Sequence, residues 1–172
     1  MAQKPLLVLE AVDVRRATQT GTSRGIILKT LTIPPIKFVT AEHAPGGGVL
    51  TVAFGKRRLQ ALEPAFSVAG LDDDVFRGMG EKDTWTFASA YRDAASGKMV
   101  AARGVIEASV TQWEPDESDP AEMQGCNHMF EEVTHFEFTL DEKEWCYVDF
   151  FEREARFMGK SLFGPVRTAL GG

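Results

Sequence analysis

The sequence has few of the residues that metal sites, disulfide frameworks and nucleic-acid grooves require. Its 172 residues include two cysteines and three histidines, too few for a disulfide scaffold or a cysteine-rich zinc site. Acidic residues outnumber basic ones by 25 to 19, for a formal net charge of −6, which argues against a protein that grips nucleic-acid phosphates. These shortages favour a soluble cytosolic protein with reduced thiols.

Targeting segments are also missing. No apolar run approaches the ~18 to 20 residues of a membrane-spanning helix. The apolar stretch at 6–9 ends at Glu10, whereas the core of a secretory signal needs about 7 to 15 apolar residues. We therefore expect a protein that is made and used in the cytoplasm and does not bind membranes.

The chain is rich in apolar residues that alternate with polar ones. Hydrophobic residues make up 44% of the sequence, and a period of two is typical of β-strands. The alternating runs are 50–54, 62–69, 84–92, 99–113 and a hairpin over 127–151 with its turn at 141–144. With no repeat and no linker, we expect a single domain over 1–172, mainly β, an antiparallel β-sandwich or barrel with one short α-helix.

Prolines within the strand runs, and terminal segments without a clear period, limit where regular strands can be placed. Pro34 and Pro35 interrupt a strand that begins near residue 26, and Pro64 indicates an edge strand or a bulge, because proline cannot donate to the ladder. Residues 1–25 and 153–172 lack a clear period. They are candidates for extended arms, and the last residues also for a short helix.

One short helix is predicted after Gly70. Asp72 is a good N-cap, Asp73 and Asp74 place negative charge in the first turn, and Gly78 and Gly80 end the helix after about two turns. The spacing of Leu71 and Phe76 fits a hydrophobic staple. The residues expected to pack this helix are Leu71, Asp72, Val75, Phe76 and Met79.

A search for catalytic or cofactor sites finds no supporting constellation. Gly46, Gly47 and Gly48 precede a strand rather than a helix, so they match neither a P-loop nor a dinucleotide fold. His128 and His135 are seven apart on one strand and should face opposite sides, and His43 has no nearby partner. The acidic stretch 114–122 lacks the spacing of a calcium loop. We expect no enzyme activity, no cofactor and no metal.

The cysteines permit a narrower prediction. If 141–144 is the turn of the last hairpin, Cys146 lies opposite Thr139, thirteen residues along the strand from Cys126. That separation excludes a disulfide within the hairpin. Two reduced thiols are the default, and a disulfide between neighbouring subunits through Cys126 and Cys146 is the alternative.

Two further features indicate contacts between chains. The glycine-rich loop has the composition of a tip that must reach another surface. The basic cluster Lys56, Arg57 and Arg58 is either a solvated turn or a contact for an acidic partner or a neighbouring subunit. Many strand edges and extended ends favour self-assembly, because exposed edges pair with other chains.

The serial order of these segments resembles the major tail tube protein family of contractile-tailed bacteriophages. The strand "LTIPPIKFVTAE" leads to the loop "APGGG", and "VLTVAFGKRRLQALEPAFSVAGLDDDVFRGMG" follows with its helix. "FASAYRDAASGKMVAARGVIEA" is similar to the family's hairpin, with Gly104 at its small position. "WCYVDFFEREARFMGKSLFGPVRTALGG" is similar to the closing segment, with Asp149 and Gly164 at matching positions. The resemblance covers residues 26–172, and residues 1–25 match poorly.

This resemblance implies a structural virion protein whose hexameric rings stack into the inner tail tube, assembled in the host cytoplasm. The tube would lie inside a contractile sheath and conduct DNA at ejection without binding it specifically. The implied partners are the sheath, the baseplate, the tail terminator and a tape measure protein in the lumen. A loop with Glu42, His43, Ala44, Pro45, Gly46, Gly47 and Gly48 would reach the next ring.

Two alternatives remain open at this stage. A type VI secretion-like tube protein has the same fold. A monomeric β-barrel that binds a small ligand is the rival from a different class.

Overall fold

A computed structural model describes residues 4–18 and 22–171. These residues form strands and two short helices. The strands are β1 (Leu7–Arg16), β2 (Leu28–Thr32), β3 (Phe38–His43), β4 (Val52–Leu59), β5 (Ala65–Ala69), β6 (Lys82–Asp93), β7 (Met99–Pro115), β8 (Gly125–Leu140), β9 (Lys143–Asp149), β10 (Glu154–Phe157) and β11 (Lys160–Ser161), and the helices are α1 (Asp73–Phe76) and α2 (Gly164–Ala169). The protein is therefore mainly β, as predicted.

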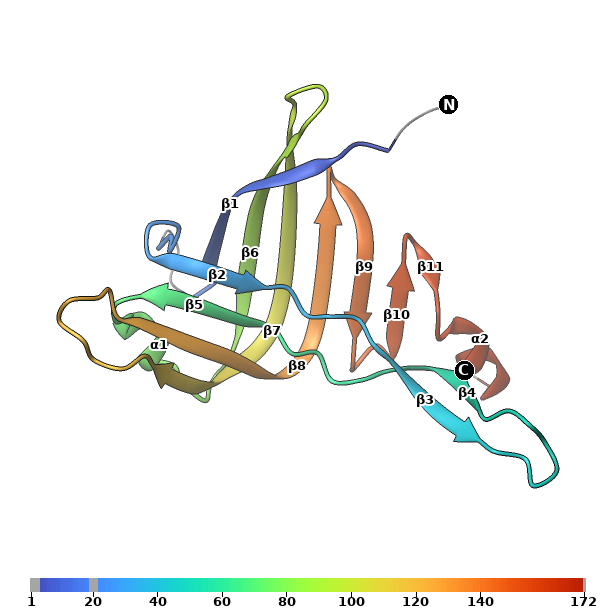
Figure 1. The fold of residues 1–172 in the computed structure, drawn as a ribbon. Helices are drawn as coiled ribbons and strands as arrows, with labels where there is room; N and C mark the ends of the chain where they lie inside the picture. The colour runs from blue at the N-terminus through green and yellow to red at the C-terminus, as the bar shows by residue number, and fades with distance from the viewer. Residues whose placement is uncertain (1–3, 19–21, 172) are drawn as a thin grey trace.

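All strand pairs are antiparallel, and one large sheet folds over itself. Its main path runs β1-β6-β7-β8-β9-β10-β11, while β5 pairs with the first half of β8 and carries β2 on its other side. The long strands β7 and β8 bend between the two layers, so that β2 and β5 cross in front of β1 and β6 (Figure 1). Register shifts near Ser109 and Val110 and a positive φ at Glu132 mark the bend, as bulges do where strands change sheets.

The core fills the space between these layers. The sheet of β1, β6 and β7 contributes Val14, Trp85, Phe87 and Ile106, all at most 2% exposed. The opposite layer contributes further buried residues: Phe66, Val68, Cys126, His128 and Phe130. Phe130 is the centre of an aromatic group, with ring centroids 5.2 Å from Trp85 and 5.4 Å from Phe66. The alternation predicted for 84–92 and 99–113 is confirmed, because its apolar face is this core.

Several sequence predictions need correction. The sheet does not close into a barrel, since β1 and β11 end its path unpaired with each other within the described residues. Two short helices are present instead of one. Pro64 does not mark an edge, because β5 begins just after it and is paired on both sides. Within the segments that were candidates for arms, β1 pairs with β6, and residues 154–161 form β10 and β11. The short helix that the sequence left as the alternative for the last residues is present as α2.

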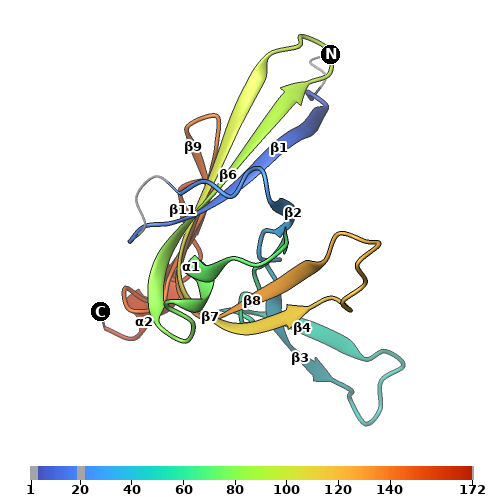
Figure 2. The ribbon, with the colours of Figure 1, turned by 90° about the vertical axis from the view of Figure 1, so that its left-hand side faces the viewer.

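Strands β3 and β4 form a separate two-stranded sheet. Pro34 and Pro35 divide β2 from β3, as the sequence predicted. The hairpin projects away from the body (Figure 1). Seen from the side, the β3–β4 hairpin extends from the layer that contains β2 and β8, at the bottom of the view. The β6–β7 hairpin extends from the opposite end of the molecule, at the top (Figure 2). The β3–β4 hairpin therefore projects from a packed body as a sheet of its own.

Candidate functional site

The residue types that catalysis would use do not converge in the described part of the chain. His43 lies on exposed β3, His128 is buried in the core, and the Nδ1 atom of His135 lies 3.1 Å from the Asp149 carboxylate. The carboxylates of Asp72, Asp73 and Asp74 are close together, but helix capping and ion pairs account for them. The carboxylates and His135 have polar partners, His43 faces solvent, and His128 stacks on Phe66 in the core. None is positioned as a nucleophile with its base.

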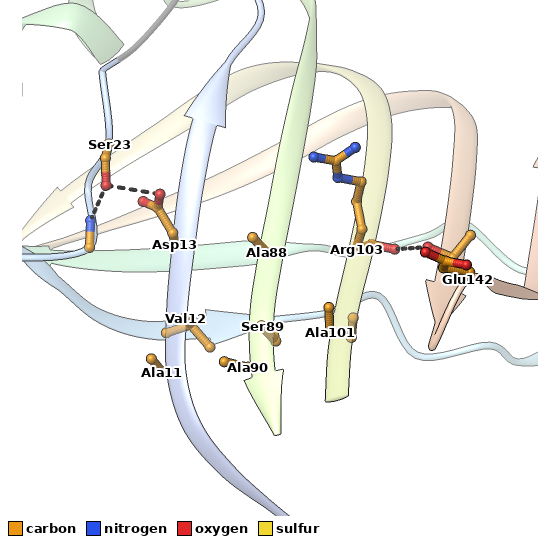
Figure 3. Close-up of a pocket in the computed structure, with 13 residues that line it drawn as sticks. Ala11, Val12, Asp13, Ser23, Ala88, Ser89, Ala90, Ala101, Arg103 and Glu142 are labelled. Atoms are coloured by element: carbon orange, nitrogen blue, oxygen red, sulfur yellow. Dashed lines mark hydrogen bonds between the residues drawn. The ribbon is translucent and has the colours of Figure 1, made fainter. Parts of the chain in front are cut away.

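A pocket on the sheet also lacks a nucleophile paired with a base. It has a volume of about 650 Å³ and lies over β1, β6 and β7, where small side chains such as Ala88 and Ala101 leave space (Figure 3). Two carboxylates line it, Asp13 and Glu142. Asp13 accepts hydrogen bonds from Ser23 Oγ and the Arg24 backbone N–H, both at 2.8 Å. Partial burial would raise the pKa of Asp13, but these bonds and Arg15 hold it below its usual range. Asp13 therefore anchors the chain after β1.

Two arginine–aspartate pairs are buried, and the sequence patterns gave no indication of them. Arg24 Nε donates to Asp72 at 2.5 Å, and Arg16 donates to Asp83. Both arginine side chains are at most 7% exposed, and both guanidinium groups lie within 5.6 Å of the Trp85 ring centroid. The Arg24–Asp72 pair holds the segment before β2 to the N-terminus of α1. The Arg16–Asp83 pair holds the start of β6 to the end of β1. Arginine and aspartate far apart in sequence carry no spacing signal that would reveal them.

The helix residues have different environments. Asp72 is the N-cap, as predicted, and its side chain accepts from the backbone N–H groups of Asp74 and Val75. Val75 is buried, but Leu71 is 68% exposed and Phe76 is 45% exposed, so the expected staple does not pack the helix. Phe76 instead contacts Trp113 edge-on at 5.0 Å. The helix has one turn rather than two, and Met79, just beyond it, is half-buried.

Both cysteines are free and buried in the subunit. Cys126 is 1% exposed and Cys146 is 6% exposed. Cys146 pairs with Phe138 rather than with Thr139, because the hairpin turns at Asp141 and Glu142 and a bulge shifts the register. Burial, with a smaller effect of Glu144, raises the pKa of the Cys146 thiol to about 11. Because both thiols are buried, any cysteine that forms a disulfide between subunits would first have to leave the core.

The β3–β4 hairpin is the most exposed ordered part of the molecule. Every residue from 42 to 58 is solvent-exposed, including apolar Val49, Leu50 and Phe54 at 106%, 68% and 58%. A two-stranded hairpin is marginally stable alone in water, and apolar groups gathered on one projection are typical of interaction sites. The hairpin is thus the best candidate for an assembly surface.

The predicted reaching loop lies at the tip of this hairpin. Glu42 and His43 belong to β3, whereas Ala44, Pro45 and the glycines lie in the connection before β4. The Gly48 backbone N–H donates to the Pro45 carbonyl at 3.1 Å, and a Cβ on Gly48 would lie 2.4 Å from Pro45 Cγ. A Cβ on Gly46 or Gly47 would meet nothing within 4 Å. Only Gly48 is required by the subunit's own structure.

The base of the hairpin touches the C-terminal segment. Arg57 Nη1 donates to the Leu162 carbonyl at 3.3 Å. Nearby, Phe150 and Phe151 form an edge-on pair and are 70% and 72% exposed. An apolar groove of about 360 Å³ lies close to the start of β3, and Phe38, Phe138, Trp145 and other side chains line it. No helix of the described residues has the length and apolarity to span a membrane.

Comparison with known proteins agrees with the resemblance stated from the sequence. The family model "Phage tail tube protein FII" matches residues 16–171. No curated protein matches. A chain in the 6-fold symmetrised cryo-EM structure of the anti-feeding prophage (AFP) baseplate has a TM-score of 0.52 and 9% sequence identity, and the match covers 81% of this chain and 95% of that chain. At this identity the structural match concerns the fold alone.

Proposed function

Since this chain belongs to the phage tail tube protein FII family, and is thus a structural component of a phage tail tube, we propose that its hexameric rings stack into the inner tube of a contractile tail. The observation that carries this proposal is the projecting β3–β4 hairpin, exposed from residue 42 to residue 58, with its apolar tip. Such an apolar projection is typical of an interaction surface and fits a protein that repeats along an axis.

The sheet edges support a ring. Within the described residues, β1 pairs only with β6, and β11 pairs only with β10, so the path has a free edge at each end. Leu6 and Leu9 beside the first edge are 70% and 52% exposed. Two different surfaces that bind each other form a heterologous contact, and six such contacts close a ring. Edge pairing between subunits would cover backbone groups that otherwise invite aggregation.

The hairpin supports stacking. Its tip, with Gly46, Gly47 and Gly48, would contact a subunit of the next ring. Val49 and Leu50 follow directly and would lose their exposure to water there, a contribution of about 1.5–3 kcal/mol for each fully buried side chain. The glycines at 46 and 47 leave room for a close backbone approach.

The charge of the chain suits a conduit for DNA. With a net charge of −6, a tube wall of many copies would repel phosphates rather than retain them. DNA would therefore pass at ejection without specific binding. The sheath, the baseplate, the tail terminator and a tape measure protein are the proposed partners, and the tube would assemble in the host cytoplasm as part of the virion. We propose no enzymatic role.

The alternatives are weaker. The strands of the described residues form no closed barrel, which weighs against a monomeric ligand-binding barrel. A type VI secretion-like tube would use the same subunit contacts, but the matching family model is of phage tail tubes.

Negative-stain electron microscopy of the concentrated protein, with mass photometry beside it, tests the proposal. Hollow rods or sixfold rings are the expected result. A strictly monomeric protein that also fails to elongate from an added preformed baseplate would contradict it.

A further inference from the structure

The charges of the molecule separate to opposite ends. The hairpin carries Lys37, Lys56, Arg57 and Arg58 against one carboxylate, Glu42. The loop between β7 and β8, residues 116–124, carries four carboxylates and no basic residue. In Figure 1 this loop lies at the far left and the hairpin at the far right. A subunit therefore cannot bring its own two surfaces together.

Most of these charges have no partner within the subunit. None of the ion pairs among the described residues includes Lys56, Arg57, Arg58 or the carboxylates of Glu117, Asp119 and Glu122. Among the described residues, the Arg57 side chain donates a hydrogen bond to the Leu162 carbonyl and forms no ion pair. By contrast, arginines on the body, such as Arg92 and Arg156, pair with carboxylates. Unpaired charges of one sign thus gather on each projection.

We propose that the basic flank of the hairpin, defined as Lys56, Arg57 and Arg58, binds the acidic β7–β8 loop of a second copy in the adjacent ring. The two surfaces differ and lie at opposite ends, so their contact is head-to-tail, and between adjacent rings it can repeat along the tube axis. Charge complementarity of this kind selects the partner and its register. This inference rests on the proposed tube function and names the surface that receives the hairpin.

Each partner surface also carries apolar groups that would be covered. Val52 and Phe54 precede the basic flank on β4 and are 38% and 58% exposed, and Met123 at the end of the acidic loop is 81% exposed. Exposed ion pairs alone contribute little, about 0–1 kcal/mol each. Apolar contact beside them supplies affinity, while the charges set which surfaces meet.

Two reciprocal variants test the contact. K56E/R58E makes the flank acidic, and E117K/E122K removes the excess of negative charge on the loop. These four side chains make no hydrogen bond or ion pair within the described subunit, so its melting temperature should not change; Arg57 is left in place because of its bond to Leu162. Each variant should form rings but no tubes, or should need a concentration at least about tenfold higher for tube growth.

Restoring complementarity provides the matched control. The four-site variant, and an equimolar mixture of the two single-side variants, should both form tubes, because the carboxylates introduced on the flank then face the lysines introduced on the loop. Wild-type tube growth should weaken toward 1 M salt, where the screening length falls to about 3 Å.

The contact is wrong if either single-side variant elongates as readily as the wild type, or if the four-site variant forms rings that do not stack. Loss of the rings themselves in a single-side variant would also overturn it, since the contact would then lie within a ring. A wild-type protein that forms neither rings nor tubes, even with an added preformed baseplate, would instead contradict the tube function.

Discussion

The body and the β3–β4 hairpin contain the same alternating pattern in different environments. In the body, Trp85 and Phe87 occupy alternate positions of β6, and Ile106 lies beside Trp85 on β7. All three are at most 2% exposed. On the hairpin, Val52 and Phe54 alternate in the same way but remain exposed. A period of two specifies a strand with one apolar face; it does not specify whether the same chain or another covers that face. The difference separates residues that stabilise the subunit from residues that assemble it.

The sharpest test compares two phenylalanines. Phe130→Ala removes a ring that is 2% exposed and packs on Trp85 and Phe66, and should lower the free energy of unfolding by about 3–5 kcal/mol. Phe54→Ala should change it by less than about 0.5 kcal/mol but weaken tube growth. Urea unfolding and electron microscopy measure the two effects. Equal destabilisation by both variants would show that the hairpin packs in the monomer.

The pH dependence of stability should come from the body. Burial lowers the pKa of His128; Asp72 opposes the shift and Arg24 adds to it. The unfolded state then binds more protons below pH 6.5, so stability falls as the pH drops through that value, by at most about 1.4 kcal/mol per pH unit. The carboxylates with lowered pKa, such as Asp83, titrate only below their usual value of 3.8.

Urea unfolding between pH 7 and pH 5 isolates His128 from those carboxylates. His128 stacks on Phe66 at 4.7 Å, so His128→Phe keeps a ring in that position and should flatten the profile. An unchanged slope in this variant would assign the pH dependence to another group.

The glycines of the tip should affect assembly and leave the monomer intact. Replacing Gly46, Gly47 and Gly48 together by alanine should block tube growth without unfolding the body, but a Cβ at position 48 also crowds Pro45 within the loop. The double variant G46A/G47A is more informative, because nothing in the subunit lies within 4 Å of the added groups. Its melting temperature should stay within a few degrees, and any loss of tubes must come from a partner surface. Normal tubes from G46A/G47A would remove these two glycines from the contact.

The smallest effect is expected from the thiols. Because both cysteines are buried and the pKa of Cys146 is raised to about 11, little thiolate forms at neutral pH. Non-reducing gels of assembled tubes should contain monomer-sized bands, and a thiol reagent should react fully only after denaturation. A dimer band that disappears in Cys126→Ser would establish the disulfide between subunits that the sequence left open.

Local patterns in the sequence determined most of the strands, the N-cap Asp72 and the proline break before β3, because each depends on residues near one another in the chain. Tertiary structure decided what is buried. Leu71 looked like part of a staple and is exposed, while Arg16 and Arg24 pair with aspartates 67 and 48 residues away. Bulges in β7 and β8 set the bend between layers, and this bend leaves the hairpin outside the core. Periodicity fixes which side chains share a face, but only the path of the whole chain determines what that face meets.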